Sequence, residues 1–295
     1  MKSHFLNGAG LALCAIAFWS TNATVAHWLL ETNQLSNVQL LQFIGAMLVF
    51  FFLKRKGPTP AAGVRLRGAV TGVLGLVGTM VFQYIAFATA PVIQANIIAY
   101  SWPLLLAISH VLLGQSSSSF FLLTSAVLGF VGVSMVSGIA SASAVFSPIG
   151  YSAAAISAIC MASYSYLVGS IEAEPRDVLL PAATIGVLGC LIWVAKTGFD
   201  YRSATELMAG LYLGAGPMGL GYLLWSLAMI RDSSGHIAVL GYLTPVTSSL
   251  LLWVTGSHLS AIALVGAMLV ITSCAAIGWQ QTVGSKSESS ESISN

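Results

Sequence analysis

Charged side chains are almost absent from this sequence. Only 7% of its 295 residues are Asp, Glu, Lys or Arg, and none of these occurs over the 104 residues from Gly68 to Ile171. An ordinary soluble domain carries about 25% charged residues, so this composition excludes one. An ionised side chain at the centre of a bilayer costs about 2.5 to 3.5 kcal/mol even on a lenient scale. A chain that keeps its charges in loops is therefore predicted to be embedded in a membrane.

Several functional classes lack their signatures. No HExxH or GxSxG motif and no buried acidic pair is present, so we expect no enzyme. The basic residues form no cluster with interleaved aromatics, so nucleic acid is not an expected partner. The cysteines are scattered through apolar segments, which predicts packing roles and neither a disulfide framework nor a metal site; they are Cys14, Cys160, Cys190 and Cys274. No cofactor is expected.

Long apolar windows are abundant instead. The mean hydropathy is +0.88, and windows of about 20 apolar residues, the length that crosses a bilayer, occur throughout. The backbone in lipid must pair its own polar groups, so the predicted fold class is an all-α membrane protein with ten transmembrane helices. The first window has no cleavage signature, so we expect the mature chain to start at Met1. The predicted spans are 8–30, 35–53, 68–88, 91–113, 118–138, 148–170, 178–195, 205–230, 234–255 and 259–282.

The basic residues predict the orientation. With the N-terminus inside, nine of the 11 Lys and Arg residues fall on the cytoplasmic side, and only Lys196 and Arg202 fall outside. This bias favours a cytoplasmic location for both termini. The tail from Gly284 to Asn295 is rich in Ser and Glu, which predicts a disordered cytoplasmic appendage.

The two halves of the chain repeat each other. At an offset of 142 residues the matched positions are Tyr100 with Tyr242, Pro103 with Pro245, Gly114 with Gly256 and, more weakly, Trp19 with Met161 and Asn22 with Tyr164; at 138 they are Tyr84 with Tyr222, Phe87 with Trp225 and Ala90 with Ala228. We expect one five-helix repeat in 1–143 and a second in 144–283. Five is odd, so the second repeat enters the membrane inverted, an arrangement typical of transporters. The alternative is that duplication only supplied ten packed helices.

These motifs resemble those of a known family. The YxxP segments of spans four and nine, Phe18-Trp19-Ser20-Thr21 in span one and the basic loop after span two are similar to the EamA type of the drug/metabolite transporter superfamily. The resemblance implies a basket of ten helices around a central cavity, built mainly by spans one, three, four, six, eight and nine. Within that superfamily the YxxP segments are most similar to bacterial inner-membrane exporters of aromatic amino acids and methyl viologen. Met161 stands where an aromatic residue is more typical.

Aromatic and amide side chains at mid-membrane depth are the candidate binding residues. Rings can stack on an aromatic substrate or hold a cation, and amides can meet a carboxylate. The candidates are Trp19, Asn22, Gln83, Tyr84, Phe87, Gln94, Asn96, Tyr100, Trp102, Tyr164, Tyr222, Trp225 and Tyr242. Pro103 and Pro245 are expected to break their helices, for gating or ligand contact. Lipid-facing or interfacial packing of these rings is the alternative.

The predicted energy source follows from the expected lack of Asp and Glu inside the membrane. Proton antiporters usually place Asp or Glu inside the membrane, and this chain has none there, so we expect facilitated alternating access driven by the substrate gradient. Histidines His27, His110, His236 and His258 are expected to be interfacial rather than a proton relay. The alternatives are a proton-coupled multidrug or metabolite efflux transporter and a pore-forming protein. The expected partners are a small-molecule substrate and the lipid bilayer, with the chain a monomer or weak homo-oligomer.

Overall fold

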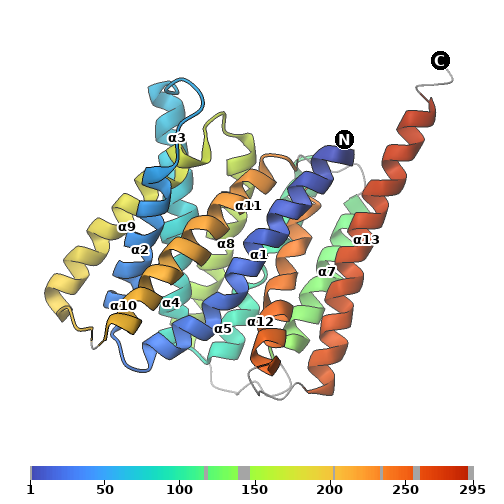
Figure 1. Cartoon of the computed structure of the whole chain (residues 1–295). Coiled ribbons are helices and arrows are strands. Elements are labelled where there is room, and N and C mark those ends of the chain that lie inside the picture. Colours follow the sequence, from blue (N-terminus) through green and yellow to red (C-terminus); the bar gives the residue numbers. More distant parts are fainter. Residues whose placement is uncertain are drawn as a thin grey trace.

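The computed structural model describes residues 2–115, 119–138, 147–201, 203–232, 235–254 and 260–291 (Figure 1). Within these ranges every regular element is a helix. The elements are α1 (Lys2–Leu30), α2 (Leu35–Phe52), α3 (Ala62–Gly72), η1 (Val73–Gly78), α4 (Thr79–Thr89), α5 (Val92–Ala99), α6 (Trp102–Leu112), α7 (Ser119–Val136), α8 (Pro148–Ser170), α9 (Pro175–Thr197), α10 (Ala204–Leu213), η3 (Gly214–Gly221), α11 (Tyr222–Met229), η4 (Ile237–Tyr242), α12 (Leu243–Val254) and α13 (Ala261–Glu291).

Apolar segments long enough to cross a bilayer account for most of the bundle. Eight such segments are present in the described residues, and they coincide with the first eight predicted spans. Two shorter apolar helices, Ile237–Leu251 and Ala261–Ile277, coincide with the ninth and tenth. The prediction of an all-α membrane protein is confirmed. Helix α13 continues to Glu291, so the backbone is helical over 284–291, where the sequence predicts disorder.

Four of the apolar segments are not regular α-helices. Wide π-helical turns form η1, in the third segment, and η3, in the eighth. The fourth segment is broken at Tyr100 and Ser101, between α5 and α6, and Pro103 follows at the start of α6. The ninth begins with the 3₁₀ helix η4 before α12. Broken or widened helices inside a membrane expose backbone carbonyls that other groups must satisfy.

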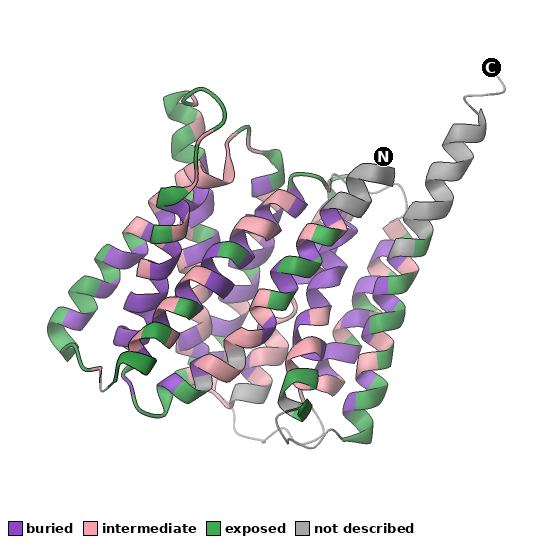
Figure 2. Ribbon diagram, viewed as in Figure 1, coloured by how far each residue is buried: buried purple, intermediate pink, exposed green. Residues whose placement is uncertain are grey.

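The helices pack as two groups around a common interior. Helix α1 packs against α11, α12 and η3, and α8 packs against α4, α5 and α6. Helices α2 and α9 pack together on one side, and α7 and α13 on the other. Figure 2 shows buried residues on the inward faces and exposed residues on the outward faces of the bundle. Large exposed apolar side chains such as Phe52, Leu112 and Phe120 lie on outward faces, as expected for contact with lipid.

The two ends of the bundle carry different features. The loop from α2 to α3 and the described ends of α1 and α13, at Lys2 and Glu291, lie at the upper end in Figure 1. The turn from α1 to α2 and the end of α4 lie at the lower end. We refer to these as the upper and lower ends below.

Candidate substrate-binding site

Two adjoining cavities lie inside the bundle. A smaller inner cavity has a volume of about 90 Å³, and a larger cavity has a volume of about 580 Å³. Both are lined by Trp19, Asn22, Gln83 and Tyr100, so they meet at these four side chains. A volume of several hundred Å³ is typical of pockets that hold a small molecule.

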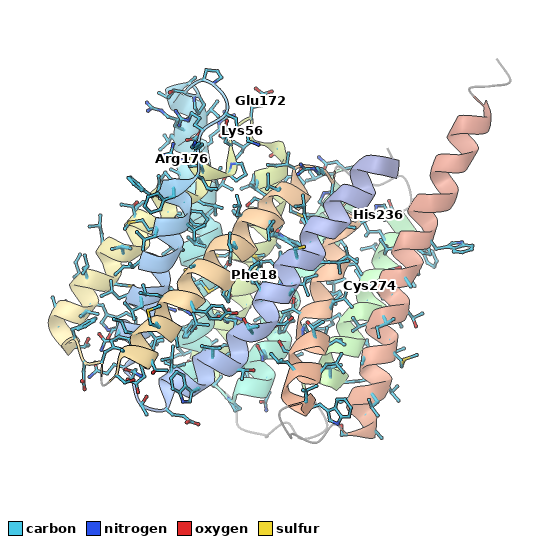
Figure 3. All side chains as sticks on the ribbon, viewed as in Figure 1. Phe18, Lys56, Glu172, Arg176, His236 and Cys274 are labelled. Carbon is cyan, nitrogen blue, oxygen red and sulfur yellow. The ribbon has the colours of Figure 1, made fainter. Side chains whose placement is uncertain are left out.

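The larger cavity reaches the lower end of the bundle. Its lining includes Leu30 at the end of α1, Leu35 at the start of α2 and Ala88 near the end of α4. Tyr84, Phe87 and Asn96 line its sides. The inner cavity lies deeper, next to Thr79, Ser157 and Thr244. Figure 3 places Phe18, the neighbour of Trp19, about half-way along the bundle, so the two cavities meet near its middle.

Both cavities are uncharged. Among the described residues, no Asp, Glu, Lys, Arg or His lines either of them. Tryptophan, tyrosine and methionine side chains supply apolar and polarisable surface, while amides and hydroxyls supply polar contacts. This combination can hold rings or cations by their π-faces and can orient a polar group by hydrogen bonds.

Unpaired amides and hydroxyls face the inner cavity. The Oε1 atom of Gln42 and the Oγ1 atom of Thr244 are buried and have no hydrogen-bond partner within the described part of the chain. The side chains of Asn22 and Gln83 make no hydrogen bond to another described residue. Buried polar atoms in folded proteins are nearly always paired, so these atoms are available to a ligand or to water.

The widened turns help to position the rings of the site. Trp19 donates its indole N–H to the carbonyl of Pro217, in η3, at 3.0 Å. Tyr222 donates its hydroxyl to the carbonyl of Gly75, in η1, at 3.4 Å. Tyr84 is held differently, because its hydroxyl accepts a hydrogen bond from Gln42 Nε2 at 3.0 Å. Carbonyls of the two π-helical segments thus anchor two of the lining rings.

A layer of buried rings adjoins the inner cavity, and none of these rings lines the larger cavity. We call Trp102, Tyr164, Tyr222 and Trp225 the aromatic layer. The ring centroids of Trp102 and Trp225 are 5.2 Å apart with an interplanar angle of 87°, and those of Tyr164 and Tyr222 are 5.6 Å apart. Trp19 contacts the layer through Tyr222 and Trp225, at 5.8 and 5.3 Å. Edge and tilted contacts of this kind are favoured arrangements of aromatic rings.

Hydrogen bonds hold Tyr164 and Trp225 of the aromatic layer in place. The hydroxyls of Tyr164 and Ser226 are 2.5 Å apart, and Trp225 donates its indole N–H to Ser165 Oγ at 3.0 Å. Tyr164 and Trp225 are both completely buried. Gly75 permits the close approach of α8, since a Cβ at this position would lie 2.2 Å from the Tyr164 ring.

The predicted site residues divide into two groups. Nine of them line a cavity: Trp19, Asn22, Gln83, Tyr84, Phe87, Asn96, Tyr100, Trp102 and Tyr222. Four do not: Gln94, Tyr164, Trp225 and Tyr242. Pro103 and Pro245 are buried in the bundle and also line neither cavity. Met161, where the sequence lacks an expected ring, does line the inner cavity.

Several lining residues were missed by the sequence analysis. The clearest is Gln42 of α2, a helix that was not expected to build the cavity. A signal was present, because Ser36, Asn37, Gln39 and Gln42 are four polar residues in an otherwise apolar helix, and all are buried. Further lining residues outside the prediction are Thr79, Met80, Ser157, Pro217, Met218, Thr244 and Ser248.

The two histidines whose side chains are described, His110 and His236, line neither cavity. His110 and His236 are buried rather than partly solvated as the sequence suggests, and the Nδ1 atom of His110 lies 3.0 Å from the carbonyl of Leu106. The His27 side chain, the whole of His258, Gly256 and Arg202 lie outside the described residues. No group of three or more possible metal ligands occurs in the described part of the chain.

Comparison with known proteins decides the family. The profile of the EamA-like transporter family matches residues 6–138 and matches again at residues 148–279. The chain belongs to the EamA-like transporter family. This EamA-like protein is therefore a transporter and not an enzyme.

Two similar proteins extend the comparison. The aromatic amino acid exporter YddG of Ancylobacter novellus is 29% identical over 215 residues, which cover 70% of this chain and 74% of that protein. A crystal structure at 24% identity superposes with a TM-score of 0.76 and covers 93% of this EamA-like chain and 98% of the other. The second similarity shows a shared fold alone.

Proposed function

We propose that this EamA-like protein exports amino acids, and aromatic ones in particular, through the two adjoining cavities. One observation carries the proposal: the cavities are lined by aromatic rings, amides and hydroxyls, with no charged side chain among the described residues. The name of the similar A. novellus protein supports the same substrate class.

The lining matches the chemistry of an aromatic amino acid. A substrate ring can stack among Trp19, Tyr84 and Tyr100, and its ammonium group can lie over a ring face, with each contact contributing roughly 0.5 to 1.5 kcal/mol. The carboxylate can accept hydrogen bonds from the amides of Asn22 and Gln83. An organic cation such as methyl viologen can use the same ring faces. The absence of an arginine or lysine partner keeps binding weak enough for release.

We also propose that ten helices cross the membrane as two inverted repeats. The family profile matches each half once. The irregular elements recur in matching spans, with η1 and η3 in the third and eighth and breaks in the fourth and ninth. Packing recurs too: α1 lies against α11 and α12, as α8 lies against α4 and the α5–α6 segment. Both cavities are lined by residues of one chain, so the proposed transport path needs a single chain, in a monomer or in a weak homo-oligomer.

Alternating access follows from this arrangement. The positive residues favour a cytoplasmic upper end, so the larger cavity faces the outside of the bacterial inner membrane and the aromatic layer closes the cytoplasmic side. Exchange of conformations between the two halves would close the larger cavity and open the aromatic layer. Glu206 is buried near the start of the eighth apolar segment, but no carboxylate among the described residues lines either cavity. A proton-coupling group is therefore missing from the described transport path, and the proposed driving force is the substrate gradient.

Counterflow in proteoliposomes tests the proposal. We expect purified protein to take up labelled tryptophan or phenylalanine saturably, and to do so faster when unlabelled substrate is preloaded inside. Methyl viologen should compete. A pore would show neither saturation nor acceleration, and that result would overturn the proposal.

The same vesicles test whether transport is coupled to a proton gradient. Uptake should proceed without an imposed pH gradient. If uptake requires that gradient, and if His236→Ala removes the requirement, the protein is a proton-coupled transporter instead.

A further inference from the structure

A second, basic pocket lies at the upper end of the bundle, far from the transport cavities. Its volume is about 440 Å³, and its lining residues are Arg55, Ala62, Arg65, Leu66, Ala69, Arg176, Asp177, Leu180 and Pro181. It is formed by the loop after α2, the first two turns of α3 and the start of α9. Figure 3 places Arg176, Lys56 and Glu172 at this end of the bundle. None of these side chains has a role in the proposed transport path.

The pocket carries an excess of positive charge. Three guanidinium groups and one carboxylate line it. Arg55 forms an ion pair with Asp177 and donates a hydrogen bond to Thr59 at 2.7 Å, so the only acid in the lining is already paired. Within the described part of the chain, Arg65 and Arg176 have no acidic partner. The Nε atoms of Arg55 and Arg176 are buried and lack a hydrogen-bond acceptor.

The backbone that carries Arg55 and Arg176 is held in place before any ligand binds. The carboxylate of Glu174 accepts hydrogen bonds from the backbone N–H groups of Lys56, at 2.9 Å, and Gly57, at 2.6 Å. Together with the Arg55–Asp177 pair, these bonds fasten the loop after α2 to the start of α9. Guanidinium donors gathered on a fixed backbone junction suit a phosphate, which accepts several hydrogen bonds.

The apolar residues around the pocket indicate that the phosphate belongs to a lipid. Ala62, Arg65, Leu66 and Ala69 follow at helical spacing, so one face of α3 carries both an arginine and apolar side chains. Leu66 and Val70 are 67% and 52% exposed, where acyl chains can cover them. A soluble phosphate would use only the arginines, whereas a lipid would use both parts of this surface.

We propose that the pocket between α3 and α9 binds the phosphate headgroup of an anionic membrane lipid. The guanidinium groups of Arg65 and Arg176 contact the phosphodiester, and the apolar residues of α3 and α9 contact the acyl chains. This inference does not depend on which substrate is transported.

Native mass spectrometry of the purified protein in neutral detergent tests the inference. We expect phosphatidylglycerol to bind in preference to phosphatidylcholine. The double variant Arg65→Gln, Arg176→Gln should bind phosphatidylglycerol about tenfold more weakly or worse, because each arginine near a lipid surface contributes severalfold. Arg67→Gln is the matched control, since Arg67 lies on the same helix and is exposed but does not line the pocket. It should leave binding unchanged.

Two results would overturn the inference. Equal weakening by Arg67→Gln and by the double variant would mean that general charge attraction, and not the pocket, binds the lipid. Full displacement of phosphatidylglycerol by millimolar inorganic phosphate would identify a soluble anion as the ligand. Size-exclusion chromatography and counterflow transport of the double variant show that its fold is intact, which keeps a binding loss interpretable.

Discussion

The lower and upper halves of the interior are built from matched residues of the two proposed repeats but packed in opposite ways. Below the middle, Asn22, Phe87 and Tyr100 line open space. Their counterparts in the second repeat are Tyr164, Trp225 and Tyr242, and all three are completely buried. One set leaves a cavity, and the other seals the bundle.

This difference accounts for three of the four predicted site residues that line neither cavity, namely Tyr164, Trp225 and Tyr242. Phe87 and Tyr100 line a cavity and match Trp225 and Tyr242, which fill space, whereas Tyr84 and its match Tyr222 both line a cavity. Under the proposed inverted repeat, the buried set is the lining of the cavity in the opposite conformation. The cavity lining and the buried set therefore correspond to the open and closed states of equivalent sites in the two halves.

The largest effect is expected where the aromatic layer is emptied. Trp225→Ala should destabilise the protein by about 3 to 5 kcal/mol, because it removes a fully buried ring between Trp19 and Trp102. Thermal unfolding in detergent measures the change. Trp253→Ala is the control, since this ring is 56% exposed, and it should leave the midpoint almost unchanged. Equal shifts would show that the layer is not tightly packed.

A second test compares chemical access to the two halves. In a background without the native cysteines, Asn22→Cys should react with an impermeant maleimide added outside intact cells, whereas Ser226→Cys should not. Substrate turnover should raise the reactivity of Ser226→Cys in inside-out vesicles, because the aromatic layer then opens. Constant protection of Ser226→Cys during transport would contradict the proposed exchange of states.

A moderate effect is expected at the ring that the two cavities share. Tyr100→Ala removes a stacking surface that contributes about 1 kcal/mol, so half-saturation in counterflow should require roughly fivefold more tryptophan. Tyr100→Phe keeps the ring and should behave like the unaltered protein. Wild-type affinity in the alanine variant would place the substrate elsewhere.

The smallest effect is expected from pH. Among the described residues, no carboxylate or histidine lines the cavities, so nothing there titrates between pH 6 and 8. With equal pH on both sides, counterflow should change by less than about twofold across this range. A steep profile abolished by His110→Ala would assign a transport role to that buried histidine.

The spans could be predicted well from the sequence because each window of residues that crosses lipid must itself be apolar and long enough. Charge exclusion and span length need no knowledge of neighbouring helices. The wide turns were not predicted, since they depend on contacts between helices, such as the bond from Trp19 to Pro217. The break at Tyr100 lies just before Pro103, a residue that was expected to interrupt its helix. Likewise, whether Tyr164 lines a cavity or fills a core depends on how close α8 lies to Gly75.

The wide turn η1 sets the direction of everything that follows it in the third span. Each residue of an α-helix turns the chain by about 100°, so one additional residue in a turn redirects every later side chain by a similar amount. Thr79, Gln83 and Tyr84 follow η1 directly and all point into the transport cavities. Deleting a single residue from Val73–Gly78 would turn these side chains toward the bilayer or toward neighbouring helices. The cavity would be lost although every residue that lines it would remain in the sequence.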